Sequence, residues 1–226
     1  MEYTILYPQY AIPPRKNSIQ QCYEIFSPLD IKIPPLESKL IFSGINLNYS
    51  QNNFYVKLEC KSDEEENIDV LGGVIDKDYK GDIGVIIYNF SCINEKTIKR
   101  GDIIAVARLL KYLDSDDKNE KFEKRNNNGY LPQKMTRGSV GWDIYTPHAN
   151  TLPKNGIITI DTGINILKPS PFHHIRYVSR SGLASKSSII VIYGDENGIL
   201  ILKNLSNKNT YTIKAGHRVA QIVYEI

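Results

Sequence analysis

The chain has 226 residues, of which 41% are hydrophobic and 23% are charged, and its formal net charge is +3. This is the composition of an ordinary globular protein, so it excludes a fully disordered or collagen-like chain and leaves room for one or two domains. So small a charge also argues against a dedicated nucleic-acid binder, which concentrates more Lys and Arg.

Short β-rich segments dominate the chain from its N-terminus to its C-terminus. They are rich in Ile, Val and Tyr and are separated by turn residues, which is typical of strands. The predicted strands are residues 31–33, 55–60, 84–90, 103–110, 157–166, 174–179, 189–193, 199–205 and 218–226. Helical periodicity is scarce, so we predict an all-β protein of sandwich, jelly-roll or barrel type.

Cysteine usage and the lack of leader-like segments bear on location. The three cysteines, Cys22, Cys60 and Cys92, are an odd number without metal-ligand spacing, which favours free thiols in a reducing compartment. The N-terminal residues lack a basic segment followed by an apolar one, and no apolar run approaches about 18 residues. We expect a soluble intracellular protein that does not bind membranes.

Residues 114–128 (DSDDKNEKFEKRNNN) differ from the rest of the chain in composition. They are highly charged and nearly devoid of apolar side chains, so they can bury little surface. We predict a solvated linker, and a long surface loop inside one domain is the alternative.

The sequence repeats itself at two constant offsets, which indicates two copies of one β unit. Pairs at an offset of 119 are residues 23–28 with 142–147 and 43–47 with 162–166; pairs at 115 are 89–91 with 204–206 and 97–99 with 212–214. The second copy is therefore four residues shorter, between Ile166 and Asn204. We assign residues 1–113 to repeat one, 114–134 to the linker and 135–226 to repeat two.

The two copies differ in a complementary way. Residues 72–84 (GGVIDKDYKGDIG) of the first copy are typical of a β-hairpin, whereas residues 193–198 of the second are a clipped turn. Residues 179–186 (SRSGLASK) of the second copy suit a phosphate cradle, whereas residues 61–66 (KSDEEE) of the first would repel phosphate. Neutral drift is one explanation; we favour a single composite site between the copies.

These segments resemble the motifs of the dUTPase family, in particular its tandem, monomeric herpesvirus-type members. Residues 72–85 resemble the third motif, 140–147 the first, 179–186 the second and 215–223 the fourth, with a degenerate fourth motif at 100–107. The resemblance implies a dUTPase-like fold in each copy and a Mg²⁺-dependent hydrolase that converts dUTP to dUMP and pyrophosphate. It implies a monomer whose partner is dUTP, with no nucleic acid, located in the host cytoplasm or nucleus if the chain is viral.

The resemblance also implies residue roles. The catalytic residues would be Asp76, the general base for the attacking water, and Asp143, which reaches the metal through water. The nucleoside would be bound by the backbone of Gly73, Val74 and Ile75 and by the ring of Tyr79. The phosphates would be bound by Arg180, Ser181 and Gly182, with a polar contact from Gln221.

The match departs from the family at the fifth motif, a glycine-rich tail with an arginine and an aromatic that caps uracil. No such tail follows the fourth motif in this sequence. Residues 125–130 (RNNNGY) keep the spacing of Arg, Gly and aromatic, so Arg125 and Tyr130 are candidates for substrate binding. A solvated linker charge at Arg125 is the alternative.

Two other functions remain open. A dUTPase-related viral protein that has lost catalysis and acts in interaction or signalling would fit the absent tail. A dCTP deaminase shares the fold, but it would show a different second motif and lack the hairpin with Tyr79, so we rank it last.

Overall fold

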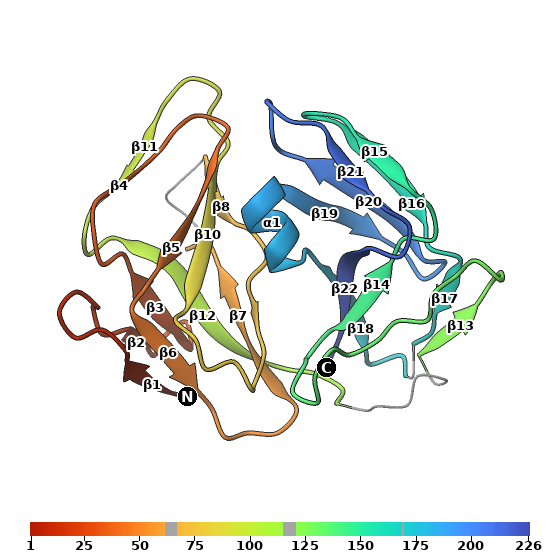
Figure 1. Ribbon diagram of the computed structural model, residues 1–226. Helices are drawn as coiled ribbons and strands as arrows, with labels where there is room; N and C mark the ends of the chain where they lie inside the picture. The colour runs from red at the N-terminus through yellow and green to blue at the C-terminus, as the bar shows by residue number, and fades with distance from the viewer. Residues whose placement is uncertain (62–66, 115–120, 169) are drawn as a thin grey trace. The chain divides into compact units, whose positions relative to one another are not determined.

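The computed structural model describes residues 1–61, 67–114, 121–168 and 170–226. The chain divides into two compact units, Met1–Leu110 and Lys111–Ile226. Both units are built of short strands (Figure 1), so the all-β prediction is confirmed. Among the described residues, no helix is long and apolar enough to cross a membrane.

Unit 1 contains the strands from the N-terminus to the end of the first copy. They are β1 (Glu2–Ile5), β2 (Arg15–Asn17), β3 (Cys22–Phe26), β4 (Ile31–Ile33), β5 (Ser38–Phe42), β6 (Ile45–Asn48), β7 (Phe54–Glu59), β8 (Ile68–Val70), β9 (Val74–Ile75), β10 (Gly84–Asn89), β11 (Lys96–Ile98) and β12 (Ile103–Lys111). The largest sheet has the order β2-β3-β12-β7-β9, and a second sheet has the order β5-β10-β8. The pairs β1-β6 and β11-β4 complete the unit.

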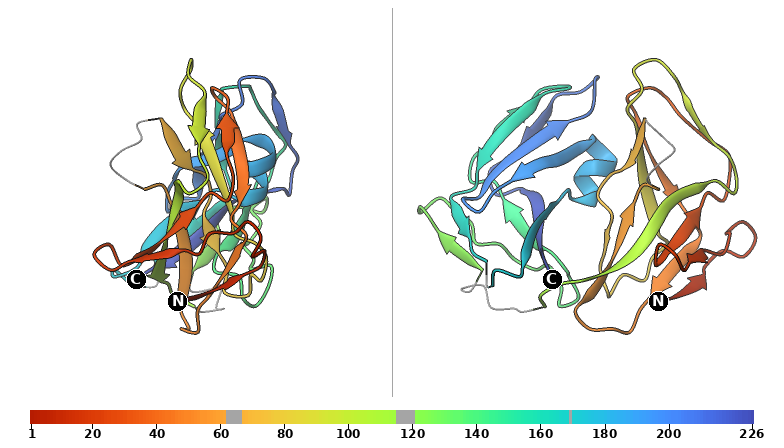
Figure 2. Two further views of the ribbon diagram at one scale, coloured as in Figure 1. Left: turned by 90° about the vertical axis from the view of Figure 1, so that its left-hand side faces the viewer. Right: turned by 180° about the vertical axis from the view of Figure 1, so that it is seen from behind.

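Unit 2 repeats this arrangement with fewer strands in its main sheet. Its strands are β13 (Phe122–Lys124), β14 (Trp142–Tyr145), β15 (Asn150–Leu152), β16 (Ile157–Asp161), β17 (Ile164–Ile166), β18 (His174–Val178), β19 (Ile189–Gly194), β20 (Ile199–Asn204), β21 (Tyr211–Ile213) and β22 (Arg218–Glu225). The sheets have the orders β14-β22-β18 and β16-β20-β19, with the pairs β13-β17 and β15-β21. The helix α1 (Ser181–Ser187), which the sequence did not lead us to expect, follows β18 (Figure 2).

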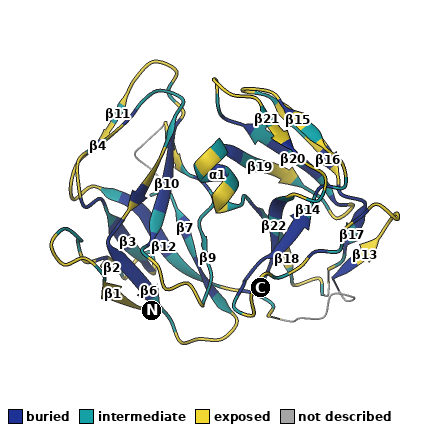
Figure 3. Cartoon of the chain, in the orientation of Figure 1, coloured by how far each residue is buried: buried dark blue, intermediate teal, exposed yellow. Residues whose placement is uncertain are grey.

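Each unit has its own apolar core, formed where inward-facing positions of its strands meet. In unit 1 the core includes Ile25, Val56 and Val85, and in unit 2 it includes Trp142 and Ile222, all of them buried. Figure 3 shows β14 and β22 mostly buried, whereas α1 keeps an exposed face. Burial of these large side chains is what fixes the register of each sheet, because a slip by one residue would turn them outward.

The strand registers of the two units correspond pair by pair. Glu24 pairs with Val106 across β3 and β12, and Asp143 pairs with Gln221 across β14 and β22. These partners are related by the same offsets of 119 and 115 that the sequence repeat shows. Both pairings also carry a register shift at the equivalent point. The duplication is therefore visible in the backbone.

A buried asparagine closes the same turn in each unit. The side-chain amide of Asn89 donates to the carbonyls of Ile33 and Asn94 at 3.0 and 2.8 Å. The amide of Asn204 donates to the carbonyls of Leu152 and Asn209 at 3.4 and 2.8 Å. Such a donor satisfies carbonyls that would otherwise be buried without partners, which explains why both copies keep the residue.

The segment expected as a linker is, in its described part, folded into unit 2. Strand β13 pairs with β17 as β1 pairs with β6, with Phe122 opposite Ile166. Phe122 is 4% exposed, and the backbone N–H of Arg125 donates to the carbonyl of Gly163 at 2.9 Å. Residues 121–130 are thus the counterpart of the N-terminal strand and turn of unit 1, and the apolar contacts of Phe122 outweigh the charged composition around it. Residues 115–120 lie outside the described part of the chain.

The predicted strand 157–166 is divided into β16 and β17 by a turn. Gly163 has φ +70°, a left-handed conformation that glycine adopts readily, and a Cβ there would lie 2.6 Å from the side-chain oxygen of Asn126. The hydroxyl of Thr162 donates to the carbonyl of Gly198 at 2.6 Å. The glycine conformation and this hydrogen bond fix a turn inside a segment that the sequence pattern predicted as one continuous strand.

Candidate active site

In unit 1, residues 72–84 connect β9, which pairs with β7, to β10, which pairs with β5 and β8, so these two strands do not pair with each other as the predicted β-hairpin would. We keep the name hairpin for this connection, and a glycine holds it against the main sheet. The backbone N–H of Leu58 donates to the carbonyl of Gly73 at 2.7 Å, and Val74 and Ile75 continue the antiparallel pairing with β7. Gly73 has φ +96°, and a Cβ at this position would lie 2.4 Å from the carbonyl oxygen of Leu58. Only glycine allows this close approach without strain.

The tip of the hairpin is closed by hydrogen bonds to the backbone. The N–H of Tyr79 donates to the carbonyl of Asp76 at 3.1 Å, and the Tyr79 hydroxyl donates to the carbonyl of Asp82 at 2.7 Å. The buried side-chain amide of Asn46 donates to the carbonyl of Gly81 at 2.7 Å. The ring of Tyr79 is 39% exposed, so it presents a surface to solvent from a fixed position.

The Asp82 carboxylate ties the hairpin to the turn between β5 and β6. It accepts the backbone N–H of Gly44 at 2.8 Å and lies 3.4 Å from the Ser43 hydroxyl. Burial raises the pKa of Asp82 above its ordinary value, although these hydrogen bonds favour the charged form. The hairpin therefore rests on a half-buried carboxylate whose ionisation carries a cost.

In unit 2, two arginines hold a buried carboxylate at the start of the main sheet. Asp143 on β14 is 1% exposed; its Oδ1 accepts Arg180 Nε at 3.0 Å and its Oδ2 accepts Arg218 Nη1 at 3.0 Å. One buried negative charge thus orients two partly exposed positive ones, which leaves a net positive cluster. Guanidinium groups fixed in this way keep further N–H donors for a phosphate.

The remaining second- and fourth-motif residues lie beside this cluster. Gln221 on β22 pairs with Asp143 on one side and Val178 on the other. Ser181 and Gly182 follow Arg180 as the first residues of α1 and are exposed. No heavy atom lies within 4 Å of a Cβ built at Gly182, so space around its backbone is open.

Two tyrosines border the cluster. Burial raises the pKa of Tyr145, with a further rise from the charge of Asp143. The ring of Tyr130, which is 47% exposed, lies 6.1 Å from the ring of Tyr145. Arg125, by contrast, forms an ion pair with Asp161 at the end of β16.

The structure brings the candidate residues together in two groups. Gly73, Val74, Ile75, Asp76 and Tyr79 share the hairpin of unit 1. Unit 2 contains the other candidates: Asp143, Arg180, Ser181, Gly182, Gln221, Arg125 and Tyr130. The sequence reasoning missed Arg218; the signal was its place in the fourth motif, opposite the strand that carries Asp143.

Unit 1 keeps a buried carboxylate at the equivalent position but lacks the two arginines that hold Asp143. Glu24, the counterpart of Asp143, is 4% exposed and pairs with Arg15, whose Nε lies 2.6 Å from the carboxylate. Ile103 stands at the position of Arg218. The acidic run at residues 63–66, whose charge contrasts with the second motif, lies outside the described residues.

The described side chains do not form a direct ligand set for a divalent cation. No group of three His, Cys, Asp or Glu side chains among them is placed to bind a metal ion. Each carboxylate oxygen of Asp143 already accepts an arginine N–H. A cation beside this cluster would take its ligands from phosphate oxygens and water.

Comparison with known proteins agrees with the motifs. The dUTPase family matches residues 9–130 and again residues 127–226. The deoxyuridine 5'-triphosphate nucleotidohydrolase of Fowlpox virus (strain NVSL) is 34% identical over 96 residues, which cover 42% of this chain and 65% of the viral protein. The mitochondrial enzyme of Homo sapiens is 34% identical over 101 residues, which cover 43% of this chain and 39% of the human protein.

Solved structures of phage dUTPases are also similar. A mutant dUTPase of the Staphylococcus aureus phage phi11, solved with a structural Mg(II) ion, has 17% sequence identity and a TM-score of 0.47 and covers 52% of this chain and 94% of the phage chain. The chain covers less than two thirds of the length of the Fowlpox virus and human relatives, and each relative matches less than half of this chain. Because the family's sequence pattern covers nearly the whole chain in two successive segments, the chain belongs to the dUTPase family.

Proposed function

We propose that this chain hydrolyses dUTP to dUMP and pyrophosphate. The observation that carries the proposal is that each unit keeps one of two groups of motif residues. The complete hairpin occurs in unit 1, and the Asp143–Arg180–Arg218 cluster occurs in unit 2. The Fowlpox virus and human relatives are both named as deoxyuridine 5'-triphosphate nucleotidohydrolases, which supports this substrate.

The hairpin of unit 1 is proposed to bind the nucleoside. Strand β9 is the last strand of its sheet, so the backbone of Gly73, Val74 and Ile75 has one side available for the polar edge of uracil. The ring of Tyr79, held by its hydroxyl, would pack against deoxyribose. Close packing there would leave no room for a 2′-hydroxyl, and UTP would be rejected.

The charged cluster of unit 2 is proposed to bind the phosphates. Arg180 and Arg218 would donate their remaining N–H groups to phosphate oxygens, while Ser181 and the open backbone at Gly182 would add neutral donors. Gln221 would add a polar contact. Asp143 would fix the arginines and contact metal-bound water.

The reaction is proposed to be an in-line displacement at the α-phosphorus. Asp76 would accept a proton from water as the water oxygen bonds to the α-phosphorus. The bond from the α-phosphorus to the bridging oxygen would break, and pyrophosphate would leave. Mg²⁺ carried by the phosphate oxygens would neutralise charge on the leaving group.

The roles of Arg125 and Tyr130 remain part of this proposal. Tyr130 lies beside Tyr145, close to the charged cluster, and is the better placed of the two for a substrate contact. Arg125 already pairs with Asp161 through one of its nitrogens, so only its remaining N–H donors would be available to a phosphate.

The direct test is pyrophosphate release from dUTP in the presence of Mg²⁺, with UTP and dCTP as competing substrates. We expect turnover of dUTP and a strong preference over both. Absence of turnover by folded protein, together with no binding of a non-hydrolysable dUTP analogue, would overturn the proposal and favour a non-catalytic interaction protein.

A further inference from the structure

One edge of the main sheet of unit 2 is open where the equivalent edge of unit 1 is filled. The 119 offset makes β18 the counterpart of β7. Strand β7 carries β9 on its outer side, whereas β18 is the last strand of its sheet, and no described strand pairs with it there. Because β7 and β18 occupy equivalent positions in their sheets, the two edges differ in whether a further strand pairs with them.

The missing partner follows from the shortened hairpin. In unit 1, β8 pairs with β10. The chain that follows β8 then crosses to the main sheet, where it pairs with β7 as β9. In unit 2 strand β19 stays paired with β20 as far as Gly194 and then turns back at once. The chain between the paired residues Val70 and Ile87 is six residues longer than the chain between Val191 and Leu202, and no described strand pairs with the outer edge of β18.

The open edge borders a hollow lined by residues of unit 2 alone. A pocket of about 530 Å³ is lined by residues that include Lys168, His174, Ile175, Tyr177, Asp195 and Glu196. An adjoining hollow of about 390 Å³ adds Arg176, Val191, Ile192 and Glu225. Ile192 and Tyr193 are 49% and 50% exposed, so the floor offers apolar surface beside the strand.

The backbone groups at this edge are turned outward. In unit 1 the N–H of Leu58 donates to the carbonyl of Gly73, the residue before β9, and Val56 lies opposite Ile75. Alternate residues of an antiparallel strand direct their N–H and C=O groups to the same side. The counterparts of Val56 and Leu58 are Ile175 and Tyr177, whose groups therefore face the hollow and are a template for another strand.

We propose that this edge binds an extended segment of a partner protein, which adds to β18 as an antiparallel strand. The duplicated unit indicates the chemistry of the segment, because Gly73, Val74 and Ile75 occupy the equivalent edge in unit 1. The partner segment is therefore a short run of glycine followed by β-branched residues.

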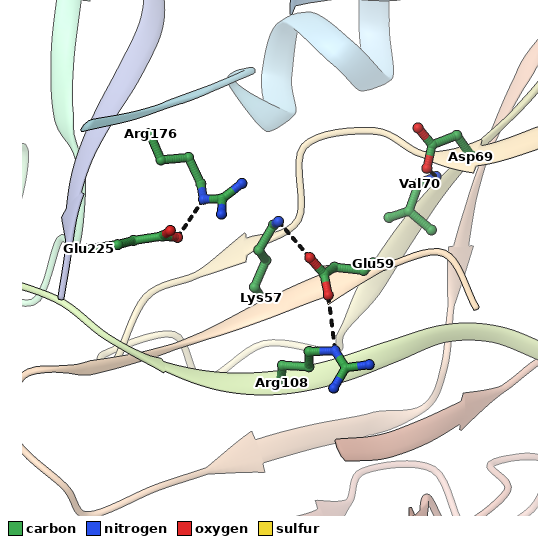
Figure 4. Close-up of polar contacts among 7 residues, drawn as sticks. All are labelled: Lys57, Glu59, Asp69, Val70, Arg108, Arg176 and Glu225. Carbon is green, nitrogen blue, oxygen red and sulfur yellow. Dashed lines mark hydrogen bonds and ion pairs between the residues drawn. The ribbon is translucent and has the colours of Figure 1, made fainter. Parts of the chain in front are cut away.

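The charges of the side chains that line the hollow indicate one further feature of the partner segment. Lys168 pairs with Glu196, and Arg176 pairs with Glu225 at 2.5 Å (Figure 4), so these charges cancel. Asp195 then gives the lining a net negative charge when His174 is neutral. A basic residue near the β-branched pair would complement it; in unit 1 Lys77 stands two residues after Ile75, with Asp76 between them.

The test titrates isotope-labelled full-length protein with a synthetic peptide of residues 71–77 (LGGVIDK) and follows backbone amide resonances. We expect saturable shifts at Ile175, Tyr177 and Tyr193. The matched control is the same peptide with an N-methyl group on its isoleucine, which removes one main-chain donor and should weaken binding about tenfold or more.

A protein variant tests the same contact from the other side. Ile175→Pro removes an outward N–H and should abolish the shifts, whereas Ile175→Val should keep them. If the proline variant does not fold, the N-methyl peptide alone decides the test. The proposal is overturned by no saturable shift, by equal binding of the N-methyl peptide, or by shifts at Val56 to Leu58 in place of β18. Shifts that appear on concentrating the protein without peptide would assign the edge to a second copy and overturn it as well.

Discussion

Asp76 stands at the turn that closes the hairpin, where its carbonyl accepts the N–H of Tyr79. If Asp76 is the general base, Asp76→Asn should lower kcat by about 10² to 10⁴, the usual contribution of such a base, while a non-hydrolysable dUTP analogue still binds. Asp78→Asn, on the same hairpin tip, is the matched control and should keep most of the activity. Full activity in Asp76→Asn would remove Asp76 from this role.

The fourth motif contains Arg218, but its role could not be predicted from the sequence, because a motif shows which residue types recur and not which atoms they contact. In the structure it holds one carboxylate oxygen of Asp143, and Arg180 holds the other. Asp143, Arg180 and Gln221 could be named from the motifs. Their mutual orientation depends on the pairing of β14 with β22, which brings together residues far apart in sequence.

Replacing Arg218 should disturb both stability and phosphate binding. Arg218→Met leaves the buried Asp143 with one cationic partner, and we expect a loss of about 1–3 kcal/mol in the free energy of unfolding, since the arginine itself is partly exposed. KM for dUTP should rise as well. Urea unfolding and steady-state kinetics measure the two effects, and Arg218→Lys, which keeps the charge, should lose less of each.

At the scale of elements, the hairpin depends on one glycine more than on its side chains. Gly73→Ala would place a Cβ 2.4 Å from the Leu58 carbonyl at a φ of +96°, so the hairpin must shift. We expect a cost of about 1–3 kcal/mol and a rise in KM, as for other strained backbone positions. Gly182→Ala is the control for stability, because its Cβ meets no heavy atom within 4 Å; equal unfolding midpoints for the two variants would contradict the argument.

The Asp82 anchor makes hairpin stability depend on pH. Burial raises the folded-state pKa of Asp82, so its stabilising contribution is present at pH values below the ordinary carboxyl pKa and is lost as pH rises through the raised value. Asp82→Asn keeps an acceptor oxygen but cannot ionise. Its unfolding midpoint should therefore improve relative to the wild type as pH rises from about 4, the ordinary carboxyl pKa, to about 7.

Strand registers could be predicted from the sequence to the extent that the repeat preserved them. The offsets of 119 and 115 match Glu24 with Asp143 and Val106 with Gln221, so the pairing in one unit implies the pairing in the other. Strand β13 could not be found in this way, because Phe122 stands alone among charged residues and gains its strand conformation from pairing with β17. Helix α1 was missed because seven residues carry too little periodicity.

At the scale of the whole molecule, duplication has allowed each copy to lose a different part. Unit 1 keeps the long hairpin, but Ile103 stands in place of Arg218, and Glu24, in place of Asp143, pairs with Arg15 instead. Unit 2 keeps the cluster, and its shorter hairpin leaves the edge of β18 open. Neither copy is expected to be active without the other, which makes the proposed function a property of the full chain.

Mixing two inactive variants tests whether one chain supplies the whole site. Asp76→Asn and Arg180→Ala remove a proposed contribution of unit 1 and of unit 2, and each should be nearly inactive alone. If both contributions come from one chain, an equimolar mixture has only the mean of the two residual rates at every protein concentration. If sites form between chains, the mixture regains activity, because pairing can unite the intact hairpin of one variant with the intact cluster of the other. The double variant is the control and should stay inactive at every protein concentration. Sedimentation at the assay concentration should show a monomer if the site is built within one chain.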